Sequence, residues 1–227
     1  MKSMSLRGSR KGQSGFTLVE IAIVLVIIGL LLGGVLKGQE LIENAKIKNL
    51  RNDLQGVTAA HYGYLDRYGQ LAGDDDKSMV RFGLDPADAP DVAVAGTPGL
   101  GDGTLAADFS NSCIDTSTEE CKYWSDLRGS GLLTGTGAKN PINSYSGVIA
   151  IVNQATANDG IASGLNVCMG NLPAKAAESL DATLDDGVPS TGAIRATAGA
   201  ANNEPADGPV AAYVDDGTSK FTVCKTL

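Results

Sequence analysis

Apolar residues follow two different patterns along the first 70 positions of this chain. Residues 21–36 form a run without a charge, and together with Phe16–Val19 they approach the ~20 residues that cross the hydrocarbon core of a membrane. Beyond this run, the larger side chains recur at alternating steps of three and four positions, which places them on one face of a helix. The members of this stripe are Ile47, Leu50, Leu54, Val57, His61, Tyr64 and Tyr68.

No proline occurs between Phe16 and Tyr68, so one long helix is predicted over residues 16–70. Its first half is apolar all round, and residues 16–36 are predicted to lie in a membrane or in the core of an assembly. Its second half is apolar on one side only, which favours packing against the rest of its own chain.

The remainder of the chain, residues 71–227, alternates short apolar runs with turn residues. Residues 71–110 are rich in Gly, Asp and Pro and predict a long surface loop. Short helices are expected from Ser117 to Gly129 and from Pro173 to Leu184. Strands are expected at residues 146–152, 165–169, 209–214 and 220–224. The predicted fold class is therefore α+β, with a long N-terminal helix packed on a small antiparallel β-sheet head.

Charge is distributed unevenly between the N-terminus and the rest of the chain. Residues 1–15 carry four basic residues and no acid, whereas the whole chain has a formal net charge of −8. The positive-inside rule keeps this basic end in the cytoplasm and places the residues after Lys37 outside. The acidic body argues against nucleic acid as a partner, because phosphate contacts need a basic surface.

The four cysteines are Cys113, Cys121, Cys168 and Cys224, and none of them forms a Cys-x-x-Cys pair. Their spacing fits no common zinc pattern, and in an exported chain an even number indicates disulfides. The pairing 113–121 and 168–224 is favoured, because it joins near neighbours and ties down the C-terminus. Free buried thiols are the alternative.

The segment "KGQSGFTLVEIAIVLVIIGLL", residues 11–31, resembles the class III signal peptide of type IV pilins and type II secretion pseudopilins. In that family a short basic leader ends in Gly and is removed by a prepilin peptidase, and the new N-terminal residue is methylated. The resemblance implies that residues 1–15 are the leader, that the Gly15–Phe16 bond is cut and that Phe16 is N-methylated. It also implies the pilin fold.

Glu20 is the one charged residue inside the apolar run. An ionisable group within a membrane segment is a functional candidate whose partner must be named. The partner we expect is the amino group that cleavage creates on Phe16 of a neighbouring subunit, since pairing at low dielectric would reward the correct axial register. The alternative is a carboxylate that only snorkels to the lipid headgroups.

Candidate chemistry in the head is limited. With His61 as the sole histidine, and without a P-loop or a Gly-x-Gly-x-x-Gly turn after a strand, no catalytic set can be assembled, and the chain is not expected to be an enzyme. Acidic clusters are abundant, and turn or solvated surface is the leading interpretation of them. If calcium is bound, the best candidates are Asp74, Asp75, Asp76 and Asp102, because calcium takes several oxygens from a flexible loop. No other cofactor is expected.

The function that the resemblance implies is structural. The chain is expected to be a subunit of a type IV pilus-like filament that polymerises with itself through its N-terminal helix. Its other partners would be prepilin peptidase and the inner-membrane assembly machinery. It would reside in the inner membrane as a precursor with a periplasmic head, and afterwards in an extracellular filament. A type II secretion pseudopilin, or a minor pilin or tip adhesin, are the alternatives; an enzyme held by an uncleaved anchor is disfavoured.

Overall fold

The computed structural model describes residues 17–83, 101–109, 113, 118–154, 161–199 and 205–227. The chain divides into two compact units, Met1–Asn44 and Ala45–Leu227. Helix α1, Leu18–Tyr68, contributes its first part to one unit and its last part to the other. The long helix predicted for residues 16–70 is thus confirmed within these bounds.

The first unit consists, in its described part, of Thr17 and the beginning of α1, which is apolar as far as Leu36. Of the described helices, α1 is the one long and apolar enough to cross a membrane, judged by length and composition. Every Leu, Ile and Val from Leu18 to Leu36 is at least 46% exposed. This segment is therefore not buried against any other part of the chain that the structure describes.

In the second unit, the last part of α1 contributes a buried stripe to the head. Leu50, Leu54 and Val57 are almost fully buried, and His61 and Tyr64 continue the same face. The steps of three and four positions between them are the reason, because an α-helix brings such positions onto one side. The amphipathic stripe predicted from the sequence is confirmed.

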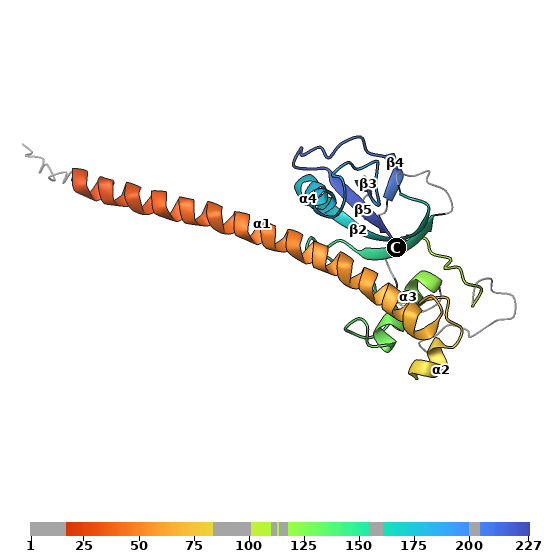
Figure 1. The fold of residues 1–227 in the computed structure, drawn as a ribbon. Helices are drawn as coiled ribbons and strands as arrows, with labels where there is room; N and C mark the ends of the chain where they lie inside the picture. Colours follow the sequence, from red (N-terminus) through yellow and green to blue (C-terminus); the bar gives the residue numbers. More distant parts are fainter. Residues whose placement is uncertain (1–16, 84–100, 110–112, 114–117, 155–160, 200–204) are drawn as a thin grey trace, which may run out of the picture. The chain divides into compact units, whose positions relative to one another are not determined.

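The head is built on one antiparallel sheet, which Figure 1 shows beside the labelled helices. Its five strands lie in the order β1-β2-β5-β3-β4. Their bounds are β1 Ile149–Gln154, β2 Gly164–Pro173, β3 Ile194–Gly199, β4 Pro205–Pro209 and β5 Lys220–Thr226. The C-terminal strand β5 lies at the centre, so the end of the chain is locked between β2 and β3.

The two faces of the sheet carry cores of different size. Alternate residues such as Val167, Met169 and Val223 face the main core, which also receives the stripe of α1 and the apolar side of α4, Ala174–Leu184. On the other face lies a small cluster in which Cys168 and Cys224 pack with Val152, Ile161 and Phe109. The α+β prediction is confirmed, and the arrangement is consistent with the pilin fold.

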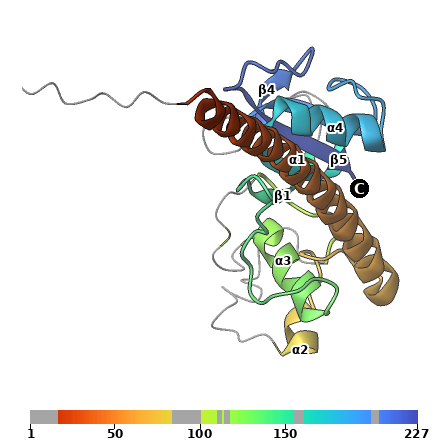
Figure 2. The ribbon, with the colours of Figure 1, turned by 90° about the vertical axis from the view of Figure 1, so that its left-hand side faces the viewer.

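Two further helices lie at the end of the head away from α4, as both views show (Figures 1 and 2). They are α2, Ser78–Phe82, and α3, Glu119–Gly129. Rings from α1 and α2 meet there: Tyr68 and Phe82 have centroids 5.5 Å apart, and Tyr64 lies against both. Helices α3 and α4 correspond to the two predicted short helices, although α3 starts after Thr118 rather than at Ser117, which lies outside the described residues.

Two elements differ from the expectations. The run 209–214 was expected to be a strand, but β4 ends at Pro209 and residues 210–214 form irregular chain. Strand β3 was not expected, because its sequence IRATAG contains mostly small residues; it is set by pairing with β5, in which Ala196 faces Val223.

The segment 71–110 is not simply a surface loop. Its described part contains α2, and Ala72, Leu105 and Ala107 are buried in the core. Small apolar residues and a single Leu carry a weak sequence signal, which explains the wrong prediction. Residues 84–100 lie outside the described residues.

Candidate functional site

The start of α1 forms a reciprocal pair of hydrogen bonds between Thr17 and Glu20. The backbone N–H and the hydroxyl of Thr17 both donate to Oε2 of Glu20, each at 2.8 Å. The backbone N–H of Glu20 in turn reaches Oγ1 of Thr17 at 3.3 Å. Since α1 begins at Leu18, Thr17 occupies the N-cap position and Glu20 the third helical position, which makes this arrangement a capping box.

The capping box changes the interpretation of Glu20. A carboxylate without donors in an apolar environment is costly, and here two donors come from its own chain. The N-terminal end of the helix dipole favours the same negative charge. Thr17 was not singled out from the sequence, although Thr-x-x-Glu before an apolar run is the signal for such a cap.

The predicted cleavage and methylation positions, Gly15 and Phe16, lie outside the described residues. The pairing of Glu20 with the amino group of a neighbouring subunit therefore stays a prediction.

The surface around this site is apolar on all sides. From Leu18 to Leu36 the helix exposes Leu, Ile and Val together with four small residues, Ala22, Gly29, Gly33 and Gly34. An added Cβ at any of these three glycines would meet nothing within 4 Å in the chain. The first charged pair follows directly, where Lys37 Nζ lies 2.7 Å from Glu40 Oε2. Such a cylinder can interact with lipid or with other helices of the same kind.

Most of the carboxylates predicted as calcium candidates accept hydrogen bonds from different groups in the structure. Asp74 accepts hydrogen bonds from the backbone N–H groups of Gly101 at 2.7 Å and Gly103 at 2.8 Å. Asp75 accepts from the Tyr64 hydroxyl at 2.7 Å and forms an ion pair with Arg81. The other two candidates differ again: Asp102 binds the hydroxyl of Thr104, and Asp76 is exposed. Calcium binding by these residues stays a prediction.

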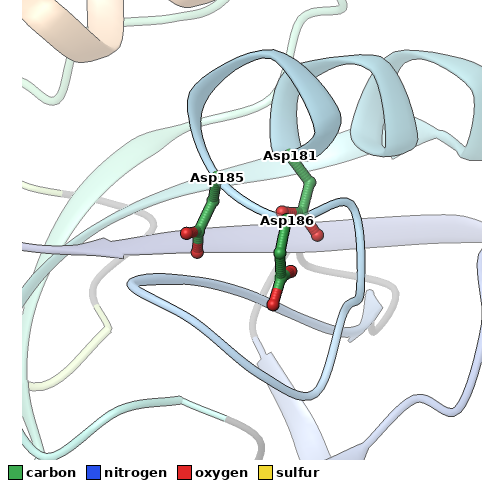
Figure 3. Close-up of side chains that lie close together, drawn as sticks. All are labelled: Asp181, Asp185 and Asp186. Atoms are coloured by element: carbon green, nitrogen blue, oxygen red, sulfur yellow. The ribbon is translucent and has the colours of Figure 1, made fainter.

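A second acidic cluster was not proposed from the sequence as a site. Asp181, Asp185 and Asp186 have carboxylate oxygens within 4.8 Å of one another, at the end of α4 and in the turn after it (Figure 3). The Tyr213 hydroxyl donates to Asp181 at 2.7 Å, and the Ile194 N–H donates to Asp185 at 2.8 Å.

The third carboxylate, Asp186, accepts a hydrogen bond from the Thr191 hydroxyl at 2.6 Å, and this bond lowers the pKa of Asp186. Burial raises the pKa of Asp181. These bonds hold the turn between α4 and β3 closed. The cluster therefore has a structural role within the head.

Two carboxylates, the buried Asp126 and the half-buried Glu119, also fasten the segment after α1 to α3. Asp126 accepts from the N–H of Gly73 at 2.8 Å, and Glu119 accepts from the N–H of Ala106 at 2.6 Å. Gly73 has φ +89°, and a Cβ there would lie 2.5 Å from the carbonyl oxygen of Glu119, so this approach requires glycine. Burial raises the pKa of Glu119 to about 7 and that of Asp126 to about 6.

Two disulfides join Cys113 to Cys121 and Cys168 to Cys224, which is the pairing favoured from the sequence. The second bridge links directly opposed residues of β2 and β5. It therefore fastens the C-terminal strand to the middle of the sheet.

His61 is a buried core residue. Its side chain is 5% exposed, and its Nδ1 lies 3.4 Å from the hydroxyl of Tyr123. Burial lowers the pKa of His61. A neutral packed histidine fits the stripe of α1 and adds no candidate for catalysis.

Comparison with known proteins identifies one segment. Residues 10–36 match the family described as the prokaryotic N-terminal methylation motif. No curated protein and no solved structure matches the chain. The match covers the predicted cleavage position, the capping box and the exposed apolar run. Residues 10–36 are therefore the class III signal peptide found in type IV pilins and pseudopilins.

Proposed function

We propose that this chain is the structural subunit of a type IV pilus-like filament. Prepilin peptidase cuts the Gly15–Phe16 bond, Phe16 is methylated, and the processed chain polymerises through the first half of α1. The observation that carries this proposal is the combination of the N-terminal methylation motif with a run from Leu18 to Leu36 that is exposed on every side.

The apolar run suits two environments in succession. In the precursor it is long enough to anchor the chain in the membrane, with the head outside. Transfer from lipid to a bundle of identical helices gains little from the hydrophobic effect, because lipid tails are as apolar as the helix. Close packing and polar pairing must then select the correct register.

In the proposed assembly, Glu20 provides the polar pairing that selects the correct register. Both donors of Thr17 bind Oε2, and a carboxylate has about four lone-pair positions, so a neighbour's amino group can be added without releasing Thr17. This amino group exists only after the leader is removed. Cleavage would therefore act as the step that makes subunits competent to assemble.

The closest alternatives share the same helix but differ in abundance. A pseudopilin of a type II secretion system, or a minor pilin or tip adhesin, would use the same leader and the same anchor. The main subunit would be the dominant chain in filaments sheared from cells, whereas each alternative would be rare in them.

One experiment tests the proposal directly. Filaments are sheared from cells, and the N-terminus of this chain is determined by mass spectrometry. We expect the chain to be abundant and to begin at methylated Phe16. A chain that retains residues 1–15 in the membrane and is absent from the sheared fraction would overturn the proposal.

A further inference from the structure

Helix α1 carries a basic segment after its apolar run. Lys46, Lys48 and Arg51 provide three cations within six residues, and residues 44–52 contain no acid. The chain that follows the helix is strongly acidic, since residues 69–227 contain 21 acidic and 9 basic residues. The basic segment therefore has the opposite charge to the rest of the head.

Two of these cations form no ion pair with any residue that the structure describes. Lys46 lies over the ring of Tyr145, 5.1 Å from its centroid. The ion pairs among the described residues are Lys37–Glu40 and Arg81–Asp75, so neither Lys48 nor Arg51 belongs to one. Lys48 is exposed and Arg51 is half-buried. We call these two residues the basic face of α1.

A complementary surface lies on the same chain. Glu178, Asp185 and Asp186 are exposed on α4 and in the turn after it, and we call them the α4 acidic patch. Figure 3 shows the two aspartates of the patch beside Asp181. Within the described part of the chain, none of the patch residues is in an ion pair. The carboxylate oxygens of Asp185 and Asp186 lie within 4.8 Å of each other, so their charges repel, and a cation brought against them lowers that repulsion.

We infer that the basic face of α1 in one copy docks on the α4 acidic patch of a neighbouring copy in the filament. This inference rests on the proposed function. A contact between two different patches of one chain is heterologous, and heterologous contacts that do not close into a ring produce open helical assemblies. Complementary charge at such a contact sets register and excludes wrong pairings.

The position of the basic face argues against lipid headgroups as its partner. Lys48 follows Leu36 by twelve residues, which is a rise of about 18 Å along an α-helix. The headgroup layer adds only about 5–8 Å on each side of the hydrocarbon core. Even for a helix tilted by about 40°, Lys48 would stand beyond that layer.

Charge reversal with rescue tests the contact in the full-length chain. The first variant is Lys48→Glu with Arg51→Glu. The second combines Glu178→Lys with Asp185→Asn and Asp186→Asn, since asparagine keeps the side-chain oxygens that accept from Ile194 and Val188. A third variant carries all five changes. Lys139→Glu, an exposed charge reversal elsewhere on the head, is the matched control.

Filament yield in the sheared fraction is compared at equal amounts of processed chain, with the head's thermal unfolding as a check on folding. We expect a loss of at least tenfold for the first and second variants, a yield restored to within about threefold for the third, and no change for the control. An unchanged yield for the first variant would overturn the inference, as would two low yields without rescue in the third.

If the first variant no longer binds phosphatidylglycerol vesicles while its filament yield is unchanged, lipid headgroups would instead be the partner of the basic face. If the wild-type chain itself is absent from filaments, the proposed function falls and this inference falls with it. The two failures are therefore distinguishable.

Discussion

The two halves of helix α1 have the same backbone and opposite relations to the rest of the protein. From Leu18 to Leu36 every large apolar side chain is exposed, whereas Leu50, Leu54 and Val57 are almost fully buried in the head. Among the described residues, the first half therefore contributes none to the core, and its apolar surface is available for a membrane or for other copies. If the proposed filament forms, one uninterrupted helix contributes to an assembly with its first half and to a folded domain with its second half.

The halves also differ in how they use charge. Glu20, in the first half, has donors from its own capping box and keeps the capacity to bind a further cation. In the second half, the hydroxyl of Tyr64 donates to Asp75, which is itself paired with Arg81. In the proposed filament, the charge of Glu20 would take a partner from outside the subunit, whereas the charge of Asp75 is neutralised by Arg81 of the same chain.

The largest expected effect of a single change is on assembly. Glu20→Ala should leave processing and the thermal unfolding of the head unchanged, because no core residue touches it, yet reduce sheared filaments at least tenfold through loss of the register-setting charge. Glu40→Ala is the matched control, since Glu40 lies on the same helix in an exposed pair with Lys37. Normal filament yield from Glu20→Ala would remove the role we assign to this carboxylate.

The second prediction concerns the sheet on which the second half of α1 packs. Removing the Cys168–Cys224 bridge opens a loop of 56 residues, and chain entropy predicts a loss of about 4 kcal/mol in the free energy of unfolding. Removing Cys113–Cys121, with a separation of 8, should cost about 2.5 kcal/mol. Denaturant unfolding of the two double Cys→Ser variants in detergent measures both values. Equal losses would contradict the chain-entropy argument.

The third prediction tests the two halves against each other with one substitution. Leu54→Ala creates a cavity in the core and should lower the free energy of unfolding of the head by about 3 kcal/mol. Leu25→Ala, on the exposed run, should change it by less than about 0.5 kcal/mol. Both variants are measured by denaturant unfolding in the same detergent. A similar loss for both would show that the first half also belongs to the folded core.

Local patterns in the sequence were sufficient where one segment determines its own structure. The steps of three and four along α1 predicted its buried stripe, and the spacing of the cysteines favoured the observed bridges. The capping box at Thr17 also has a local signal, Thr-x-x-Glu before an apolar run.

Structure that depends on distant partners could not be predicted in this way. Strand β3 has small residues and exists because β5 pairs with it from more than 20 positions away. The segment around Asp74 and Asp75 reads as a solvated acidic loop, yet both side chains are buried because backbone N–H groups and the Tyr64 hydroxyl reach them. A carboxylate in a sequence gives no sign of such donors.

The smallest expected effect is on the pH dependence of the head, to which the second half of α1 belongs and the first half does not. Burial raises the pKa of Glu119 from about 4.5 to about 7 and that of Asp126 from 3.8 to about 6. The folded state therefore binds protons that the unfolded state releases, so stability rises as pH falls through these values. After discounting the half-exposed Glu119, we expect a gain of about 1–2 kcal/mol between pH 8 and pH 5.5.

Two other groups limit that gain. Burial lowers the pKa of His61, so its contribution to stability is lost as pH falls below about 6.5, and the contribution of Asp75, whose pKa is lowered by donors such as Tyr64, is lost only in stronger acid. The difference in free energy of unfolding between the wild type and Glu119→Gln/Asp126→Asn is taken at each pH. The contributions of His61 and Asp75 are the same in both chains and cancel. The double variant should lose the gain, whereas Glu20→Gln should keep it, because Glu20 belongs to the half of α1 that has no part in the core. An identical pH profile for the wild type and the double variant would show that the carboxyls of Glu119 and Asp126 do not titrate in this range.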